Sequence, residues 1–313
     1  MDARLAIVLP VLFVCGCAAQ MPRAESAVAV VPYTLRDAGR IVVDVQINRQ
    51  GPFRFAIDTA ATGSFIVERV RQQLELDVVG GETATVHGAV ASGEFSLVEV
   101  EQLSVGRENW GRRRLIALPG DTPATETLDG VLGIDFLLDY SIGFSVRQRE
   151  LSLYRPEQLA DEAYRGWATI ELEPVFVGAA EQPLQFFAVT ISGRQVDALF
   201  DLGSGFNVLN SAAAAELDLA SRIARQNELS GAIGTESILV RFGAESIRTG
   251  RVGWRNERFL IADIDIFELL ELGDTPAAIL GSGLFTQRDF VIDLSRRRVL
   301  VRIAMQEQET IAD

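Results

Sequence analysis

Two aspartates in the sequence stand where a carboxylate could do acid–base chemistry. Asp58 ends the strand-like residues 53–57, and Asp201 ends residues 198–200. A short loop of mostly small residues follows each of them, formed by Thr59, Ala60 and Ala61 in the first case and by Leu202, Gly203 and Ser204 in the second. An aspartate at the end of a strand is most often a turn residue, so neither one alone indicates a catalytic site.

Other reactive residue types are scarce, and their scarcity excludes several kinds of site. The chain has 313 residues with one histidine, His87, and two cysteines, Cys15 and Cys17, and all 29 of its basic residues are arginine. It therefore has no histidine cluster for zinc, no lysine for a Schiff base or a phosphate-binding loop, and no cysteine nucleophile beyond the N-terminus. A Ser-His-Asp triad would have to use His87. Carboxylates remain as the acids and bases of this protein.

The surroundings of the two aspartates form an internal repeat. Residues 55–66 read FAIDTAATGSFI, residues 198–209 read ALFDLGSGFNVL, and the two segments align without a gap. Thirty residues after each aspartate comes a glycine-containing turn, at Gly88 and at Gly231. Each half then has an apolar segment with a central glycine and closes on a matching pair of strand-like segments. Because the landmarks recur in one order, the sequence indicates a duplicated domain.

The repeated pattern resembles the retropepsin/pepsin-like aspartic peptidases, over roughly residues 33–303. That family has an apolar strand leading into Asp-Thr-Gly-Ala or Asp-Thr-Gly-Ser, a glycine-bearing flap, and an apolar-apolar-Gly segment packed against the active loop. The resemblance places Asp58 and Asp201 at the catalytic positions and the residues after them in the active loops. It implies an exported bacterial member with both lobes in one chain. The expected fold is all-β with few short helices, a bilobal pepsin-like double β-barrel with pseudo-two-fold internal duplication.

The chemistry implied by the resemblance suits the residues that are present. Two carboxylates about 3 Å apart cannot both ionise, so such a pair shares one proton. The ionised member can take a proton from a water molecule, while the protonated member polarises the scissile carbonyl. Because water is the nucleophile, we expect no metal and no other cofactor.

Two positions depart from the family's pattern. Ala60 replaces the glycine that follows Asp-Thr, and Leu202 replaces the second threonine. In the family, the hydroxyls of both threonines bond the backbone of the opposite loop, and here only Thr59 could do so. The sequence therefore leaves open an aspartic endopeptidase of envelope proteins or a catalytically silent lipoprotein that binds a peptide or partner in its cleft. A homodimer in which Asp58 faces its own copy is a third arrangement.

The elements that must position the loops are predicted to be mostly strands. Short runs rich in β-branched and aromatic residues predict strands over residues 41–47, 53–57, 95–105 and 114–118. Helices are predicted over residues 68–76, 156–164 and 211–219, the last with Asn210 or Ser211 as its N-cap.

The turns at Gly88 and Gly231 are expected to be flaps over the cleft, with His87 and Gly88 in the main one.

The other aspartates near strand ends lack the loop of small residues. We interpret them as turn or surface carboxylates: Asp44, Asp135, Asp139, Asp289 and Asp293.

The N-terminus is typical of an export signal. An apolar run over residues 5–14 follows Arg4, and it is shorter than the about 20 residues that span a bilayer. Residues 14–17 (VCGC) resemble a bacterial lipobox, which would make Cys17 the lipidated first residue of the mature protein. The alternatives are ordinary cleavage near Ala19, which gives a soluble periplasmic protein, and an uncleaved anchor. In each case the globular part leaves the cytoplasm, for the periplasm or the membrane of the bacterial envelope.

The domain order and the charge complete the expectations. We predict a signal peptide over 1–17, a tether over 18–30, an N-terminal lobe over 31–155, a connector over 156–165, a C-terminal lobe over 166–305 and a tail over 306–313. The formal net charge of −14 argues against nucleic acid as a partner. We expect a monomer that takes an extended peptide or protein substrate by strand pairing and meets the membrane only through its lipid anchor.

Overall fold

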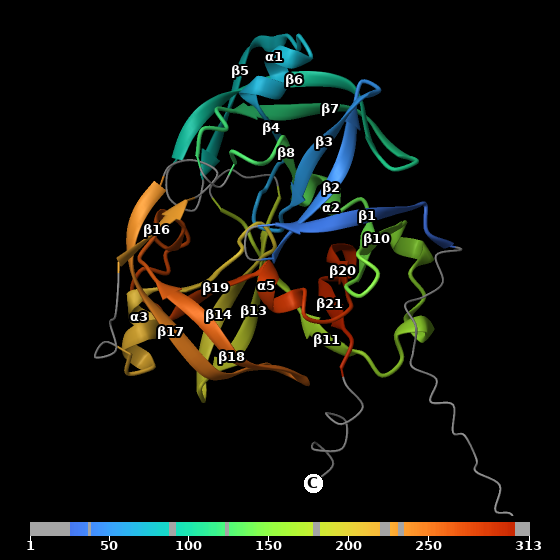
Figure 1. Cartoon of the computed structure of the whole chain (residues 1–313). Helices are drawn as coiled ribbons and strands as arrows, with labels where there is room; N and C mark the ends of the chain where they lie inside the picture. Colours follow the sequence, from blue (N-terminus) through green and yellow to red (C-terminus); the bar gives the residue numbers. More distant parts are fainter. Residues whose placement is uncertain are drawn as a thin grey trace, which may run out of the picture.

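A computed structural model gives the structure of the protein over residues 26–36, 39–87, 92–122, 125–177, 182–219, 226–230 and 235–303. Strands form most of these residues, and the helices among them are short. The fold is all-β with few short helices, as the sequence predicts. Figure 1 shows the two halves of the chain as separate β structures that meet near the middle of the molecule.

The strands of the first half are β1 (Ala29–Arg36), β2 (Arg40–Ile47), β3 (Gln50–Ile57), β4 (Phe65–Val67), β5 (Val78–His87), β6 (Ser92–Val105), β7 (Glu108–Leu118), β8 (Gly130–Leu132), β9 (Ser141–Ser145) and β10 (Glu150–Tyr154). Those of the second half are β11 (Ala168–Glu171), β12 (Glu173–Val175), β13 (Leu184–Ile191), β14 (Arg194–Asp201), β15 (Asn207–Leu209), β16 (Gln226–Ser230), β17 (Thr235–Thr249), β18 (Val252–Ile261), β19 (Ala277–Gly281), β20 (Phe290–Asp293) and β21 (Arg298–Val301). The helices are α1 (Glu68–Gln73), α2 (Ile134–Leu137), α3 (Ser211–Glu216), α4 (Asp265–Leu269) and α5 (Ser282–Phe285), with 3₁₀ turns η3 (Pro156–Gln158), η4 (Asp161–Tyr164) and η5 (Leu294–Arg296).

Each half closes strands into a barrel with the same order. In the first half, β2, β3, β8, β4, β7 and β6 are neighbours in turn, and the pairing of β2 with β6 closes the ring. In the second half, β13, β14, β19, β15, β18 and β17 follow the same order, and β13 pairs with β17. The duplication predicted from the sequence is therefore present as two barrels with matching topology.

A six-stranded part of the larger sheet joins the two halves, in the order β11-β21-β20-β9-β10-β1. Its middle is the antiparallel pairing of β9 with β20, in which Ile142 lies opposite Ile292. The rings of Phe144 and Phe290 stack there with their centroids 4.4 Å apart. Because β20 and β21 come from the end of the chain, the predicted C-terminal lobe contributes strands to a sheet that it shares with the first.

The burial pattern of a strand depends on how many of its faces are covered. In β1, every second side chain from Ala29 to Tyr33 is buried, and the residues between them are exposed. In contrast, β9 and β19 are buried along their whole length, as expected for strands covered on both faces. Buried side chains from both halves join in one continuous core that includes Phe55, Phe200 and Phe285.

Several predicted boundaries shift. β1 begins at Ala29, inside the stretch predicted as a tether, because Ala29 pairs with Leu153 of β10. α1 ends at Gln73 rather than at residue 76, since Glu75 has a positive φ of 52°. The predicted helix over 156–164 is the two 3₁₀ turns η3 and η4. Asn210 caps α3 as predicted, and its side chain accepts a 2.9 Å hydrogen bond from the Ala213 amide.

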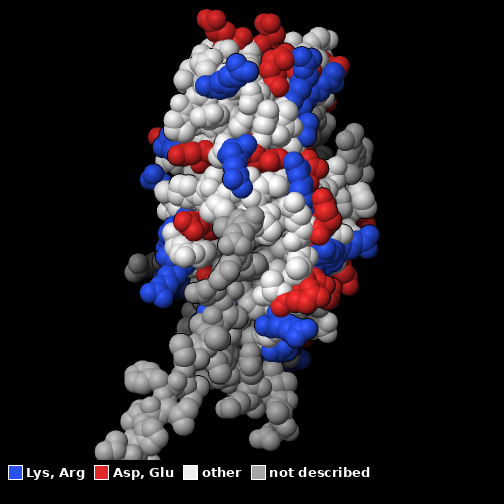
Figure 2. Space-filling model, turned by 90° about the vertical axis from the view of Figure 1, so that its right-hand side faces the viewer, with Lys and Arg blue, Asp and Glu red and all other residues white. Residues whose placement is uncertain are grey.

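The surface of the first barrel carries paired charges. Arg112 of β7 bonds Glu101 of the neighbouring β6 at 2.9 Å, and Arg114 of β7 bonds Glu82 of β5 at 2.7 Å. Figure 2 shows one face of the molecule on which acidic and basic side chains are interspersed, and the described residues gather no broad basic patch there. No helix among the described residues has the length and apolar character needed to cross a membrane.

Candidate active site

The first loop is held at the end of β3. β3 runs parallel to β8, and the amide of Asp58 donates to the Leu132 carbonyl at 3.0 Å. The carboxylate of Asp58 turns back on its own loop, where its Oδ1 accepts hydrogen bonds from the amides of Ala60 at 2.8 Å and Ala61 at 3.0 Å. These bonds fix the carboxylate in one orientation.

The second loop repeats this arrangement at the end of β14. β14 runs parallel to β19, whose Gly281 lies in register with Asp201. Oδ1 of Asp201 accepts a 2.9 Å hydrogen bond from the Ser204 amide. The two aspartates therefore occupy equivalent places in the two barrels, as the repeat predicts.

The two loops meet at Gly203. A Cβ atom added to this glycine would lie 2.2 Å from the carboxyl carbon of Asp58, a distance at which no side chain fits. The carboxylate of Asp58 therefore lies directly against the backbone of the second loop. This close approach requires glycine at position 203.

Thr59 links the loops across the lobes. Its hydroxyl donates to the Phe200 carbonyl at 2.6 Å and accepts from the Leu202 amide at 3.0 Å. Thr59 and Leu202 are both completely buried. Leu202 thus takes part through its backbone, while its side chain packs in the hydrophobic core.

Each loop is supported by one of the apolar segments with a central glycine. The Gly133 amide donates to Ser64 Oγ at 2.9 Å, and the Gly281 amide donates to Asn207 Oδ1 at 2.9 Å. A Cβ at either glycine would lie within 2.8 Å of loop backbone atoms, so both are packing positions. Sequence reasoning did not single out Ser64 and Asn207, although each lies six residues after its aspartate in the aligned repeat.

Burial acts on both carboxyls. It raises the pKa of Asp201, and the neighbouring charge of Asp58 raises the pKa of Asp201 further. Burial also raises the pKa of Asp58, against the hydrogen bonds from Ala60 and Ala61 and the charge of Arg40, which lower it. Two neighbouring acids that both resist ionisation share a proton over part of the pH range.

Comparison with known families agrees with this geometry. Residues 43–139 match the family of gag-polyprotein aspartyl proteases, and residues 187–284 match the family described as aspartyl protease. Each match spans one barrel and contains one of the two aspartate loops.

The chain belongs to the retropepsin/pepsin-like aspartic peptidase clan. The two family matches support aspartic protease activity in general terms. A comparison with curated proteins finds no match.

Relative to the clan's pattern, this member retains one of the two threonine links between the lobes. Thr59 makes the inter-lobe bonds described above, and Leu202 offers no hydroxyl for the reciprocal ones. Ala60 holds the position of the first loop's glycine, and its amide still donates to Asp58.

The expected flaps lie largely outside the described residues. His87 is the last residue of β5, and the structure does not describe its side chain; Gly88 and Gly231 belong to undescribed segments. Cys17 and the tail over 306–313 are also outside the described residues.

Three aspartates interpreted as turn or surface carboxylates are instead buried or half-buried, and two of them, the buried Asp293 and the half-buried Asp289, lie at the joint between the halves. Asp293 is completely buried and bonds Arg298 at 3.1 Å, and Asp289 bonds Arg302 at 2.8 Å. A third, Asp135, is half-buried and accepts a 2.7 Å hydrogen bond from Ser64. For Asp293 the interpretation was wrong because this strand end lies at the joint, where the first half covers it and Ser141 donates a 3.2 Å hydrogen bond to its carboxylate.

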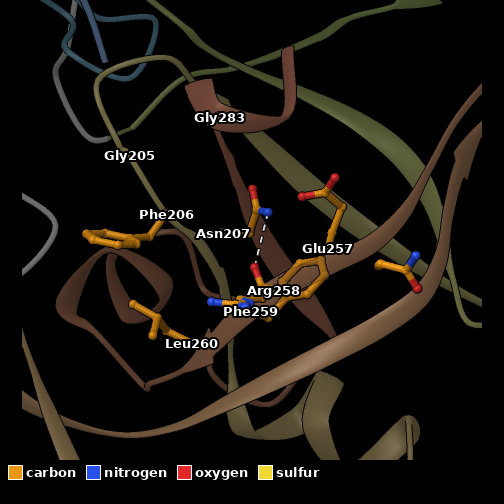
Figure 3. A pocket seen from close by; sticks show the side chains of 9 residues that line it. Gly205, Phe206, Asn207, Glu257, Arg258, Phe259, Leu260 and Gly283 are labelled. Atoms are coloured by element: carbon orange, nitrogen blue, oxygen red, sulfur yellow. Dashed lines mark hydrogen bonds between the residues drawn. The ribbon is translucent and has the colours of Figure 1, made fainter. Parts of the chain in front are cut away.

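A pocket of about 390 Å³ adjoins the second loop. Figure 3 shows Phe206 and Leu260 on one side of it, and the Asn207 amide donating to the Arg258 carbonyl at 3.2 Å. Phe206 is an apolar residue that is 46% exposed in the lining of this pocket. Within the described residues, no cluster of histidine, cysteine, aspartate or glutamate could hold a metal ion.

Proposed function

We propose that this protein is an aspartic endopeptidase that hydrolyses peptide bonds with a water molecule activated between Asp58 and Asp201. The observation that carries this proposal is the contact of the two loops, in which Asp58 lies against Gly203 and Thr59 bridges to Phe200 and Leu202. Because the loops come from different barrels of one chain, a single chain supplies both carboxylates.

In this mechanism the ionised aspartate removes a proton from the water molecule, and the oxygen of that water attacks the scissile carbonyl carbon. The protonated aspartate donates a hydrogen bond to the carbonyl oxygen and stabilises the tetrahedral intermediate. The C–N bond then breaks, and a proton passes from the pair to the leaving amine. The pair ends with one proton, as it began, so no further reactant is needed.

The proposed substrate is an extended segment of an envelope or periplasmic protein. Such a segment would lie between the barrels by strand pairing, and its side chains would enter pockets such as the one beside Phe206. The enzyme would act as a monomer without nucleic acid.

From the N-terminal residues we propose that the protein is located in the bacterial envelope. The lipobox-like residues 14–17 support a lipid anchor on Cys17. Cys17→Ser should move the protein from the membrane fraction to the soluble periplasmic fraction, and an unchanged distribution would argue against lipidation at this cysteine.

The test of the catalytic proposal is incubation of the purified protein with a mixed peptide library between about pH 4 and pH 7. We expect cuts at defined sequences, and we expect Asp58→Asn and Asp201→Asn to remove all of them, because a general acid–base pair contributes about 100- to 10,000-fold to the rate. Asp44→Asn, on the exposed side of β2, is the matched control.

A second function is favoured by one specific observation. Leu202 stands where the clan has a threonine whose hydroxyl would complete the inter-lobe bonds. Loops that lack these bonds could support peptide binding without catalysis. A catalytically silent lipoprotein of this kind would retain library peptides without cutting them. That result would contradict the endopeptidase.

A further inference from the structure

The first residue of β2, Arg40, lies beside the candidate active site. β2 pairs antiparallel with β3, and Val42 lies opposite Ala56. Continuing this register by two residues places Arg40 opposite Asp58. Residues opposite one another in an antiparallel pair present their side chains on the same face, with Cβ atoms about 5 Å apart.

The second barrel has a different residue at the equivalent position. β13 pairs antiparallel with β14, and Phe186 lies opposite Leu199. The same continuation places Leu184, the first residue of β13, opposite Asp201. The two halves therefore hold an arginine beside one aspartate and a leucine beside the other, although the strands around them match.

Arg40 is also enclosed to a degree that is unusual for arginine. It is only 8% exposed, whereas arginine is almost never this buried unless it has a specific role or partner. The neighbouring Gly39 packs against α5, where an added Cβ would lie 2.9 Å from the Cα of Gly283. Since α5 directly follows Gly281, the start of β2 lies at the junction of the lobes beside the second loop.

The other charged residues near the loops are either exposed or bonded to residues outside the aspartate pair. Arg36 of β1 and Asp44 of β2 are exposed, as are Arg194 and Asp197 of β14. Arg54 pairs with Asp129, and Asp135 bonds Ser64. The charge of Arg40 acts on both catalytic positions, lowering the pKa of Asp58 and that of Asp201 against the burial that raises them.

We propose that Arg40 is a positioning residue that keeps one negative charge on the Asp58–Asp201 pair and thereby sets the lower pH limit of its activity. A fixed cation beside two acids favours their ionised forms. The working state of the pair carries one proton, so it exists between the pH at which the first carboxyl ionises and the pH at which the second does. Removing the cation moves both limits upward.

The test measures the titration of the pair directly. Full-length protein carrying ¹³C-labelled aspartate carboxyls is followed by NMR across the pH range, and the two signals are assigned by their loss in Asp58→Asn and Asp201→Asn. In Arg40→Leu, which copies the residue of the second barrel, we expect both midpoints to rise by about one pH unit or more. Arg40→Lys should restore midpoints close to those of the unchanged protein, because it keeps the charge.

Arg36→Leu is the matched control, because Arg36 lies opposite Arg40 on β1 but is exposed. It should leave both midpoints in place. If Arg40→Leu does not fold, Arg40→Gln removes the same charge with a polar side chain and gives the same comparison. Midpoints unchanged in the folded neutral variant would overturn the proposal.

The activity profile supplies a second readout, which rests on the proposed function. The acid limb of kcat/KM should move upward in Arg40→Leu and return in Arg40→Lys. If the unchanged protein cleaves no peptide, the proposed function fails, while the NMR midpoints still decide the role of Arg40. The two failures are therefore distinguishable.

Discussion

Asp58 and Asp201 hold equivalent places in the repeat but have different surroundings. Both accept amide hydrogen bonds from their own loops, but in the strand register Asp58 lies opposite Arg40, whereas Asp201 lies opposite Leu184. Differences of this kind determine which member of the pair is ionised more easily.

The raised pKa of Asp201 predicts an effect on stability. In the unfolded chain an aspartate ionises near pH 3.9, while burial and the charge of Asp58 favour the protonated form of Asp201 in the fold. The folded state then binds more protons, so stability falls as the pH rises above about 4. Asp201→Asn removes this penalty and should be more stable than the unchanged protein at pH 7, with the difference vanishing below about pH 4.

Urea denaturation at several pH values checks this prediction. Asp197→Asn, an exposed aspartate on the same strand, is the control for the loss of one carboxylate. The difference in free energy of unfolding between Asp201→Asn and the unchanged protein should be larger at pH 7 than at pH 4. A smaller difference at pH 7 than at pH 4 would contradict the account.

Thr59 predicts a second effect at the residue scale. Its hydroxyl satisfies the buried Phe200 carbonyl and Leu202 amide, so Thr59→Val leaves two buried polar groups without this partner. We expect a loss of about 2–4 kcal/mol in the free energy of unfolding. Thr59→Ser keeps the hydroxyl and should retain most of the stability; equal losses in both variants would show that the methyl group matters more than the bonds.

At the residue scale, the sequence predicted the aspartates and the loop residues but not their supports. Asp58 and Asp201 share a visible pattern of apolar strand and small residues. Ser64 and Asn207 each accept the amide hydrogen bond of a central glycine, but their side chains differ. A search for identical residues in the two halves therefore does not reveal them. Arg40 is separated from Asp58 along the chain, and only the strand register brings the two together.

Among the elements, the loop containing Gly203 makes the sharpest prediction. Gly203→Ala would place a methyl group on the Asp58 carboxylate, which must then move. Because a displacement of about 1 Å in a catalytic group can cost about 100-fold, we expect kcat/KM to fall by at least that factor. Ala60→Gly, at the equivalent place in the first loop, is the matched comparison and should keep activity within a few-fold.

The pocket beside the second loop predicts a change in specificity. Phe206→Ala removes the exposed ring from its lining, so peptides with a large apolar side chain at that subsite should lose about tenfold in kcat/KM. Phe176→Ala removes another exposed phenylalanine outside the lining and serves as the control. An equal loss for all peptides would place the effect outside the pocket.

At the scale of elements, strands were predicted better than helices. The runs over 41–47 and 53–57 lie within β2 and β3, because their β-branched and aromatic residues favour strands. The stretch over 156–164 has helical residues, but tertiary contacts divide it into two 3₁₀ turns. The buried α2 and α5 are four residues each, too short to show a helical period.

At the scale of the whole molecule, the repeat predicted two lobes, and the structure adds the sheet that joins them. The pairing of β9 with β20 connects residues about 150 positions apart, and no local pattern indicates which strands meet. The burial of Asp293 and the partial burial of Asp289 follow from this pairing. These two carboxylates were interpreted as turn or surface residues because the sequence does not indicate that the two halves share a sheet.

The central claim is that one chain carries a complete, working pair of aspartates. Its most direct test is kcat/KM, on one peptide that the unchanged protein cleaves, for Asp58→Asn, Asp201→Asn and an equimolar mixture of the two. We predict that each variant falls at least about 1,000-fold and that the mixture recovers nothing, because each chain lacks one member of its own pair. Activity in Asp201→Asn alone, or recovery in the mixture, would show that the aspartates of two chains work together and would contradict the claim.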